Sequence, residues 1–395
     1  MEKTEKISVV KCQNYDYDYD KVYLAVKQAV DIIGGMESFV KKGQRVALKV
    51  NLLMKVTPEK CATTHPAVAY AVAKLVLEAG ATPFIIDSAG GPFTSGYINA
   101  IYKSSGMQEV ADKLGIETNQ DFGSVDVSHP EAKVGLKFPY LKALAECDAI
   151  INLSKLKTHS FTGYTNCIKN MFGVIPGLAK VEMHGKYRSL NQFANFIFDI
   201  HSFIGDKLVL NITDAVMGME GDGPSNGEPR EIGVILAGKS AICSDVVACQ
   251  IIGINPSATP FIRVGIERGF ATSDFSEIEV VGEKIEDVFV PNFKNVVPDE
   301  YKPYANYVPR FLQNTVHRLM TKRPVISKRK CKGCKKCYDH CPAKAIEMVG
   351  KDGQVKKAEI DYNKCIRCYC CQELCPFGVV KVKAGIIYKL THRGR

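Results

Sequence analysis

The chain has 395 residues, of which 46% are hydrophobic and 24% are charged, and this balance excludes a disordered or collagen-like protein. Its length is enough for two or three domains. The net charge of +10 is uneven, because residues 321–395 carry 19 Lys and Arg against 6 Asp and Glu. We find no export signal and no apolar run of about 18 residues, so we expect a cytoplasmic protein with no membrane span.

Residues 1–287 alternate between apolar runs typical of buried parallel strands and segments with helical spacing. This alternation predicts an α/β domain with a mostly parallel, Rossmann-like sheet and flanking helices. The expected strands are 45–53, 82–87, 149–153, 208–213 and 232–237. The expected helices include 23–33, 66–79, 190–204 and 244–252.

Polar side chains follow several of these strands, where ligands of α/β folds bind. Each group on its own is also what an ordinary loop contains, but together they predict one cleft. Its lysines and amides suit an anionic substrate group such as a carboxylate or phosphate. The candidate substrate-binding residues are Lys49, Asn51, Asp87, Lys155, Lys157, Thr158, Lys169, Asn170, Asp214 and Glu220.

In the segment 154–184, five lysines and histidines lie beside Thr, Asn and Gly: Lys155, Lys157, His159, Lys169 and His184. They predict a loop that donates hydrogen bonds to an oxyanion. His159 and His184 are the candidate catalytic residues, because an imidazole can act as a general acid near neutral pH. The alternative for both is a hydrogen-bonded structural histidine. No spacing supports metal ligation by this pair.

Residues 233–240 satisfy the phosphate-loop expression G-x4-G-K-[ST]. The four residues between the two glycines are the apolar strand itself, so no open loop is left to wrap phosphates. We therefore expect no nucleotide site there. A G-x-G-x-x-G fingerprint and a C-x3-C-x2-C run are also missing from the sequence.

Residues 288–326 contain five prolines, which predicts a linker rather than one long helix. Within it, residues 306–320 have helical apolar spacing. We interpret them as a short linker helix, with a membrane-surface or partner helix as the alternative.

The expected third region, 327–395, contains two runs with the spacing C-x2-C-x2-C-x3-C-P. This is the bacterial ferredoxin pattern for two [4Fe–4S] clusters, in which the fourth Cys of each run ligates the other cluster. A pair of zinc sites would instead need two C-x2-C pairs for each ion. We therefore expect a small α+β ferredoxin-like domain. The metal ligands would be Cys331, Cys334, Cys337 and Cys375 for one cluster and Cys341, Cys365, Cys368 and Cys371 for the other.

Cys370 stands outside this pattern, and we interpret it as a bystander. The six cysteines outside the tail are scattered singly, which argues against a disulfide framework.

Two oxidised clusters would carry about −4 in total and offset part of the basic charge. The remaining charge would steer a redox partner with an acidic surface. Nucleic-acid binding is a competing interpretation, but stacking aromatics are sparse here.

Several short segments resemble the iron–sulfur proteins of the domain of unknown function 362 family. The matching segments are 49–51, 63–66, 87–90, 155–159, 168–173 and 220–224, together with Asp245. The resemblance covers about residues 45 to 270, and the tail extends it to the end. It implies the fold and a redox context typical of anaerobes, but no particular reaction.

Clusters fused to a pocket domain favour an oxidoreductase, in which two [4Fe–4S] clusters feed the reduction of an anionic small molecule bound in the α/β domain. The alternative is a non-catalytic ferredoxin-type carrier or adaptor that docks to a partner oxidoreductase. The sequence does not indicate whether a flavin binds.

Overall fold

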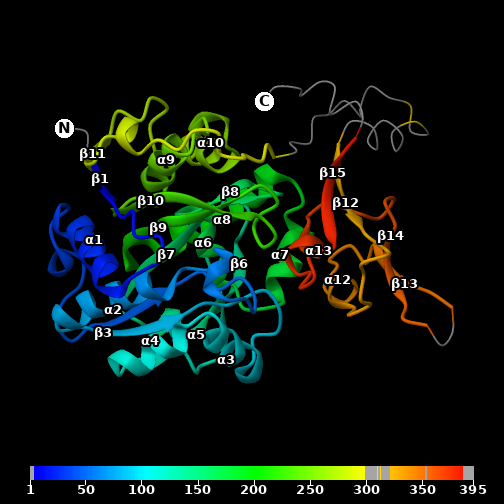
Figure 1. Ribbon diagram of the computed structural model, residues 1–395, viewed down its shortest axis with the longest axis horizontal. Coiled ribbons are helices and arrows are strands. Elements are labelled where there is room, and N and C mark those ends of the chain that lie inside the picture. The colour runs from blue at the N-terminus through cyan, green and yellow to red at the C-terminus, as the bar shows by residue number, and fades with distance from the viewer. Residues whose placement is uncertain (1–3, 299–308, 310–311, 313–320, 352–353, 386–395) are drawn as a thin grey trace.

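The structure is a computed structural model that describes residues 4–298, 309, 312, 321–351 and 354–385. Its body is built around a nine-stranded mixed sheet (Figure 1). The order is β11-β1-β10-β9-β7-β2-β3-β4, and β8 pairs with β7. The strands are β1 (Glu5–Lys11), β2 (Arg45–Lys49), β3 (Thr82–Ile86), β4 (Glu117–Thr118), β7 (Ala149–His159), β8 (Gly163–Thr165), β9 (Leu208–Glu220), β10 (Glu228–Gly238) and β11 (Ile278–Gly282).

The sheet is mostly parallel. Five of its pairs are parallel (β1–β11, β2–β3, β2–β7, β3–β4 and β7–β9), whereas β1–β10, β9–β10 and β7–β8 are antiparallel. A separate antiparallel pair is formed by β5 (Ser124–Ser128) and β6 (Lys137–Leu141). The expected α/β fold is therefore confirmed, with an antiparallel part at the β10 side.

Helices cover both faces of the sheet. Along β10, Val234 and Leu236 point into one hydrophobic core and Ile235 and Ala237 into the other, as the two-residue period of a strand requires. One core lies under α1 (Tyr19–Asp31), α2 (Pro66–Glu78), α3 (Ser95–Ser104) and α4 (Met107–Leu114). The other lies under α5 (Lys142–Glu146), α6 (Cys167–Asn170), α7 (Ala179–Lys186), α8 (Leu190–Ile204), α9 (Ala241–Ile251) and α10 (Pro260–Glu267).

Two central strands run further than the sequence predicts. β7 continues from 153 to His159 and β9 from 213 to Glu220, and every residue of β7 is buried. The prediction of a loop directly after residue 153 is therefore wrong. The polar side chains of this stretch are satisfied inside the sheet, as where Ser154 Oγ donates to Asn166 Oδ1 at 2.6 Å.

The helix predicted at 190–204 is confirmed as α8, and 66–79 agrees with α2 to one residue. Two other helices begin earlier than predicted, because side chains cap them. Asp18 accepts the backbone N–H of Lys21 before α1, and Ser240 accepts that of Cys243 before α9. Residues 233–238 lie within β10, so their interpretation as strand is confirmed.

The tail contains two small antiparallel pairs and two one-turn helices. Its elements are β12 (Lys322–Ile326), α12 (Lys336–Asp339), β13 (Ile346–Val349), β14 (Lys357–Ile360), α13 (Cys370–Glu373) and β15 (Val380–Ala384). β12 pairs with β15, so residues 322–326 belong structurally with the tail. The helix expected at 306–320 lies outside the described residues apart from 309 and 312. The boundaries 1–287, 288–326 and 327–395 stay a prediction.

A capping box fixes the start of α8: Ser189 Oγ accepts the backbone N–H of Gln192, whose side chain accepts the backbone N–H of Ser189. We predict that Ser189→Ala lowers the free energy of unfolding by about 1 kcal/mol, because one helix N–H loses its partner. Urea denaturation followed by circular dichroism measures this loss. Thr94→Ala is the matched control, because Thr94 precedes α3 without a capping hydrogen bond; equal losses in the two variants would contradict the prediction.

Candidate functional site

The eight cysteines of the two runs line two separate cavities in the tail. The outer set, Cys331, Cys334, Cys337 and Cys375, surrounds a cavity of about 300 Å³. The inner set, Cys341, Cys365, Cys368 and Cys371, surrounds one of about 330 Å³. The structure thus brings together the four cysteines of each expected set, including the fourth Cys that each run contributes to the other.

The surroundings of these thiols fit four-iron clusters. In the described residues no three His, Cys, Asp or Glu side chains are close enough to share one metal ion. The backbone N–H of Ala345 lies 3.2 Å from Cys341 Sγ, and N–H groups of this kind stabilise cluster sulfurs. The inner set would hold one cluster and the outer set the other.

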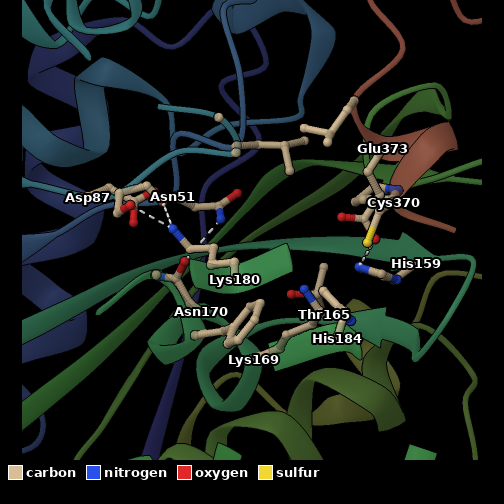
Figure 2. Close-up of a pocket in the computed structure, with 18 of the residues that line it drawn as sticks. Asn51, Asp87, His159, Thr165, Lys169, Asn170, Lys180, His184, Cys370 and Glu373 are labelled. Atoms are coloured by element: carbon tan, nitrogen blue, oxygen red, sulfur yellow. Dashed lines mark hydrogen bonds and ion pairs between the residues drawn. The ribbon is translucent and has the colours of Figure 1, made fainter. Parts of the chain in front are cut away.

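A larger cavity, of about 750 Å³, lies where the body meets the tail (Figure 2). It opens beyond the carboxyl ends of β2 and β3, beside the far end of β7, as expected for an α/β fold. Seven of the predicted substrate-binding and catalytic residues line it. They are Asn51, Asp87, Lys157, His159, Lys169, Asn170 and His184.

Three lysines face this cavity. Lys157 Nζ donates to Asn51 Oδ1 at 2.6 Å and to the carbonyl of Ala62, and Lys180 Nζ donates to Ser88. Lys169 has no hydrogen-bond partner among the described residues. Its ammonium lies 5.8 Å from the centre of the Phe172 ring.

Burial lowers the pKa of all three ammonium groups, since a charged amine is costly away from water. The pKa of Lys157 falls to about 7, with a smaller contribution from the nearby charge of Lys169, and that of Lys180 also falls to about 7. Two carboxylates, Asp87 and Glu373, share the cavity wall, and Asp87 already pairs with Lys49 at 2.6 Å. Cations therefore outnumber carboxylates here, and an anionic ligand would restore the balance.

The two candidate histidines are buried in the cavity wall. His159 Nδ1 accepts the backbone N–H of Phe161, which leaves the ring proton on Nε2, 3.0 Å from Glu373 Oε1. His184 stacks on Phe193 with 4.6 Å between ring centres, and its Nδ1 has no hydrogen-bond partner among the described residues.

Burial lowers the pKa of both imidazoles to about 4. Both rings are therefore neutral at pH 7, and the expectation that they act as general acids near neutral pH is not supported. Lys157 and Lys180, whose pKa values lie near 7, meet that requirement better. Glu373 ionises easily: burial opposes its charge, but His159 and Lys169 lower its pKa to about 2.

Five predicted substrate-binding residues do not line the cavity. Lys155 Nζ lies 2.9 Å from Asp214 Oδ2 and 2.8 Å from the hydroxyl of Tyr17, in a fully buried network that ties β7 to β9. Lys49 lies beneath the cavity, paired with Asp87. The hydroxyl of Thr158 donates to the carbonyl of Gly221, and Glu220 accepts the backbone N–H of Lys294. Their polar groups are used inside the fold.

Sequence reasoning missed three residues of the cavity wall: Lys180, Cys370 and Glu373. Lys180 follows the turn at Pro176 and Gly177, and nothing in its neighbourhood distinguishes it from a surface lysine. Cys370 and Glu373 come from α13 in the tail, and Figure 2 shows both reaching toward His159. The one sequence signal was a ninth tail cysteine between two expected ligands, and Cys370 lines this cavity as well as that of the inner set.

The tail docks on the body through α13 and the strand after it. Gln372 is fully buried, and its side-chain Nε2 donates to the backbone carbonyl of Asp222 at 3.2 Å. The backbone carbonyl of Gln372 accepts a hydrogen bond from the side chain of Asn226. Lys381 forms an ion pair with Asp222 at 2.9 Å. A Cβ atom at Gly90 would lie 2.9 Å from Leu374 Cδ2, so the glycine lets this leucine of the tail pack closely on the body.

Two family models match separate parts of the chain. Residues 330–379 match the family model of a 4Fe-4S dicluster domain, so the tail is a ferredoxin-type iron–sulfur domain that supports electron transfer. Residues 46–250, just over half of the chain, match the family described as Domain of unknown function (DUF362), and the chain belongs to this family.

Two relatives share sequence with the chain. The Thylakoid-associated protein sll1697 of Synechocystis sp. is 29% identical over 323 residues, which cover 79% of this chain and 98% of that protein. The Pyruvate synthase subunit PorD of Methanocaldococcus jannaschii is 33% identical over 69 residues, which cover 18% of this chain and 76% of that subunit.

Two solved structures resemble the chain weakly. The lactate racemase apoprotein from Thermoanaerobacterium thermosaccharolyticum is 11% identical with a TM-score of 0.38, and a Thermotoga maritima protein is 15% identical with a TM-score of 0.33. They cover 63% and 59% of this chain, which spans 57% and 58% of theirs, and similarity at this level says nothing about activity. Among the helices described, none has the length and apolarity needed to cross a bilayer.

The Lys155–Asp214 pair is structural in this arrangement, so its loss should destabilise the fold and leave the cavity intact. We predict that Asp214→Asn lowers the free energy of unfolding by about 3–5 kcal/mol, because the buried Lys155 ammonium loses its counter-charge. Urea denaturation of this variant beside Asp206→Asn, a change at an exposed carboxylate, provides the comparison. A loss below about 1 kcal/mol for Asp214→Asn would contradict the structural role.

Proposed function

We propose that the protein is a ferredoxin-dependent oxidoreductase that reduces an anionic small molecule bound in the cavity between body and tail. One observation carries this proposal: the cation-lined wall of the body and α13 of the iron–sulfur domain enclose the same cavity. A ligand there would touch both the groups that neutralise its charge and the part of the tail next to the clusters.

The body's side chains would bind and orient the substrate. The unpartnered ammonium of Lys169 would hold a carboxylate or phosphate oxygen, with Lys180 as a second donor. The amides of Asn51 and Asn170, which hydrogen-bond to each other at 3.0 Å, would fix its orientation. His159, whose Nε2 lies 3.0 Å from Glu373 Oε1, would hold that carboxylate in place in the cavity wall.

The reduction needs electrons, and it needs a proton for each new bond to hydrogen that it forms. Bound [4Fe–4S] clusters supply one electron each, drawn from a partner protein with an acidic surface. Lys157 and Lys180 keep a proton on Nζ at a pH near 7 and would pass it to the substrate. α13 closes the cavity on the tail side and keeps water from the reacting atoms.

We propose a cytoplasmic location, since all fifteen cysteines are free thiols.

The second candidate is a non-catalytic electron carrier or adaptor. The similarity of the tail to a small subunit named for pyruvate synthase favours it, and so do the exposed lysines around the outer set. The two candidates differ in the cavity, because a carrier has no need of one that binds anions.

Anion binding gives the first test. We predict that Lys169→Gln weakens the binding of malonate by about tenfold to a hundredfold, because an ammonium–carboxylate hydrogen bond is lost. Isothermal titration calorimetry of the anaerobically purified, cluster-containing protein measures the dissociation constant. Lys137→Gln, a change at an exposed lysine away from the cavity, is the matched control. Absence of binding by the wild-type protein to malonate, citrate and phosphate esters alike would favour the carrier.

The lowered lysine pKa values give a second test. Lys157 and Lys180 are cationic below pH 7 and lose their protons above it, so we predict that sulfate binds more weakly as the pH rises from about 6 to about 8. The groups that face Lys157 are Lys155, Lys169, Asp87 and Glu373. Sulfate itself does not titrate in this range, so its dissociation constant reports the protein. A flat pH profile would show that neither lysine changes charge there.

A further inference from the structure

One cysteine lies between two cavities. The first is the cavity surrounded by the inner set of cysteines, here called the inner cavity, and the second is the larger cavity between body and tail, here called the substrate cavity. Cys370 is 4% exposed, stands between Cys368 and Cys371 in the chain, and lines both cavities. Among the described residues none lines both the outer cavity and the substrate cavity. The inner set is therefore one side chain away from a bound ligand, and the outer set is further away.

The docking contacts hold this arrangement in place. α13 carries Cys370, and in the same turn Gln372 is hydrogen-bonded to the body and Glu373 lies against His159. β15, which follows, is tied down by the ion pair between Lys381 and Asp222. α13, which carries Cys370 into the wall of the inner cavity, is thus held against the body (Figure 1).

The outer set lies under a basic surface. Cys334 is exposed, and so are Arg329, Lys330, Lys332, Lys335 and Lys336 around it. No ion pair of these five cations occurs among the described residues, so their charge is free to attract a partner. A protein with an acidic surface would be steered to this loop, next to the thiol that is most open to solvent.

We propose that the two cysteine sets have different positions in one electron path: the outer set receives electrons from an acidic donor protein at the loop 329–336, and the inner set passes them to the substrate cavity across Cys370. Each transfer moves one electron. The donor would be oxidised by one electron as the outer cluster is reduced, and the inner cluster would be reduced as the outer one is reoxidised. The inner cluster would in turn be reoxidised as the bound substrate accepts that electron. This inference rests on the proposed reduction in the cavity and specifies its direction.

Midpoint potentials test the inner half of this proposal without any substrate. A cation beside a cluster stabilises its reduced, more negative form. Lys169→Gln should therefore shift the potential of the inner cluster to more negative values and leave the outer one unchanged. The matched variant Lys357→Gln removes an ammonium that donates to the carbonyl of Cys331, and should shift only the outer potential.

The readout is an EPR-monitored redox titration of the fully loaded protein, with Cys334→Ser used to assign the outer signal. Iron and sulfide content show whether each variant is loaded. A shift of both potentials by Lys169→Gln, or of the outer one alone, would overturn the inner assignment. Lys169→Gln could shift only the inner potential and Lys357→Gln only the outer one in a protein that binds no anion. That result would support the positions proposed for the two clusters and contradict the proposed reduction in the cavity.

Reduction kinetics test the outer half. Reduced flavodoxin is an acidic electron donor, so we expect Lys332→Gln combined with Lys335→Gln and Lys336→Gln to lower its rate of reducing the protein several-fold at low salt. Reduced methyl viologen, a cation, should not lose rate with this variant. An unchanged flavodoxin rate would exclude the loop as the docking surface.

Discussion

The structure depends on the docking of α13 against the body. A buried polar group needs a partner: Gln372 Nε2 donates to the carbonyl of Asp222 in the turn after β9, and Glu373 lies against His159. These contacts fix α13 in one position. The same short helix thereby closes the substrate cavity and carries Cys370 into its wall, so the geometry of the site follows from the way the two parts of the chain fit together.

Electrostatics explain the rest of the site. Four lysine side chains lie in or directly beneath the cavity, and the two carboxylates there do not balance them. The body tolerates this because burial lowers the pKa of the lysines, so part of the charge is given up near pH 7. An anion that enters would bind these amines and restore their protons. In the proposed function, binding and proton uptake would be coupled by the same groups.

Much of this could be predicted from the sequence. The apolar runs showed the sheet, and α8 was predicted residue for residue, because its apolar residues recur with helical spacing. The spacing of the tail cysteines was enough to group them as the structure does. Lys155 and Asp214 were predicted to bind substrate, but they lie in buried strands and pair with each other. A buried strand whose polar groups are satisfied has the same composition as a loop, so the sequence did not distinguish the two. Glu373 and Cys370 were missed because docking between distant segments leaves no local pattern.

The central claim is that an anion bound by the body lies next to the inner cluster. Electron–nuclear double resonance of the dithionite-reduced, fully loaded protein with ¹³C-labelled malonate tests this most directly. The account predicts a dipolar coupling between the ¹³C nuclei and the spin of the inner cluster, which disappears in Lys169→Gln. Malonate that binds by calorimetry but shows no coupling to either cluster would contradict it.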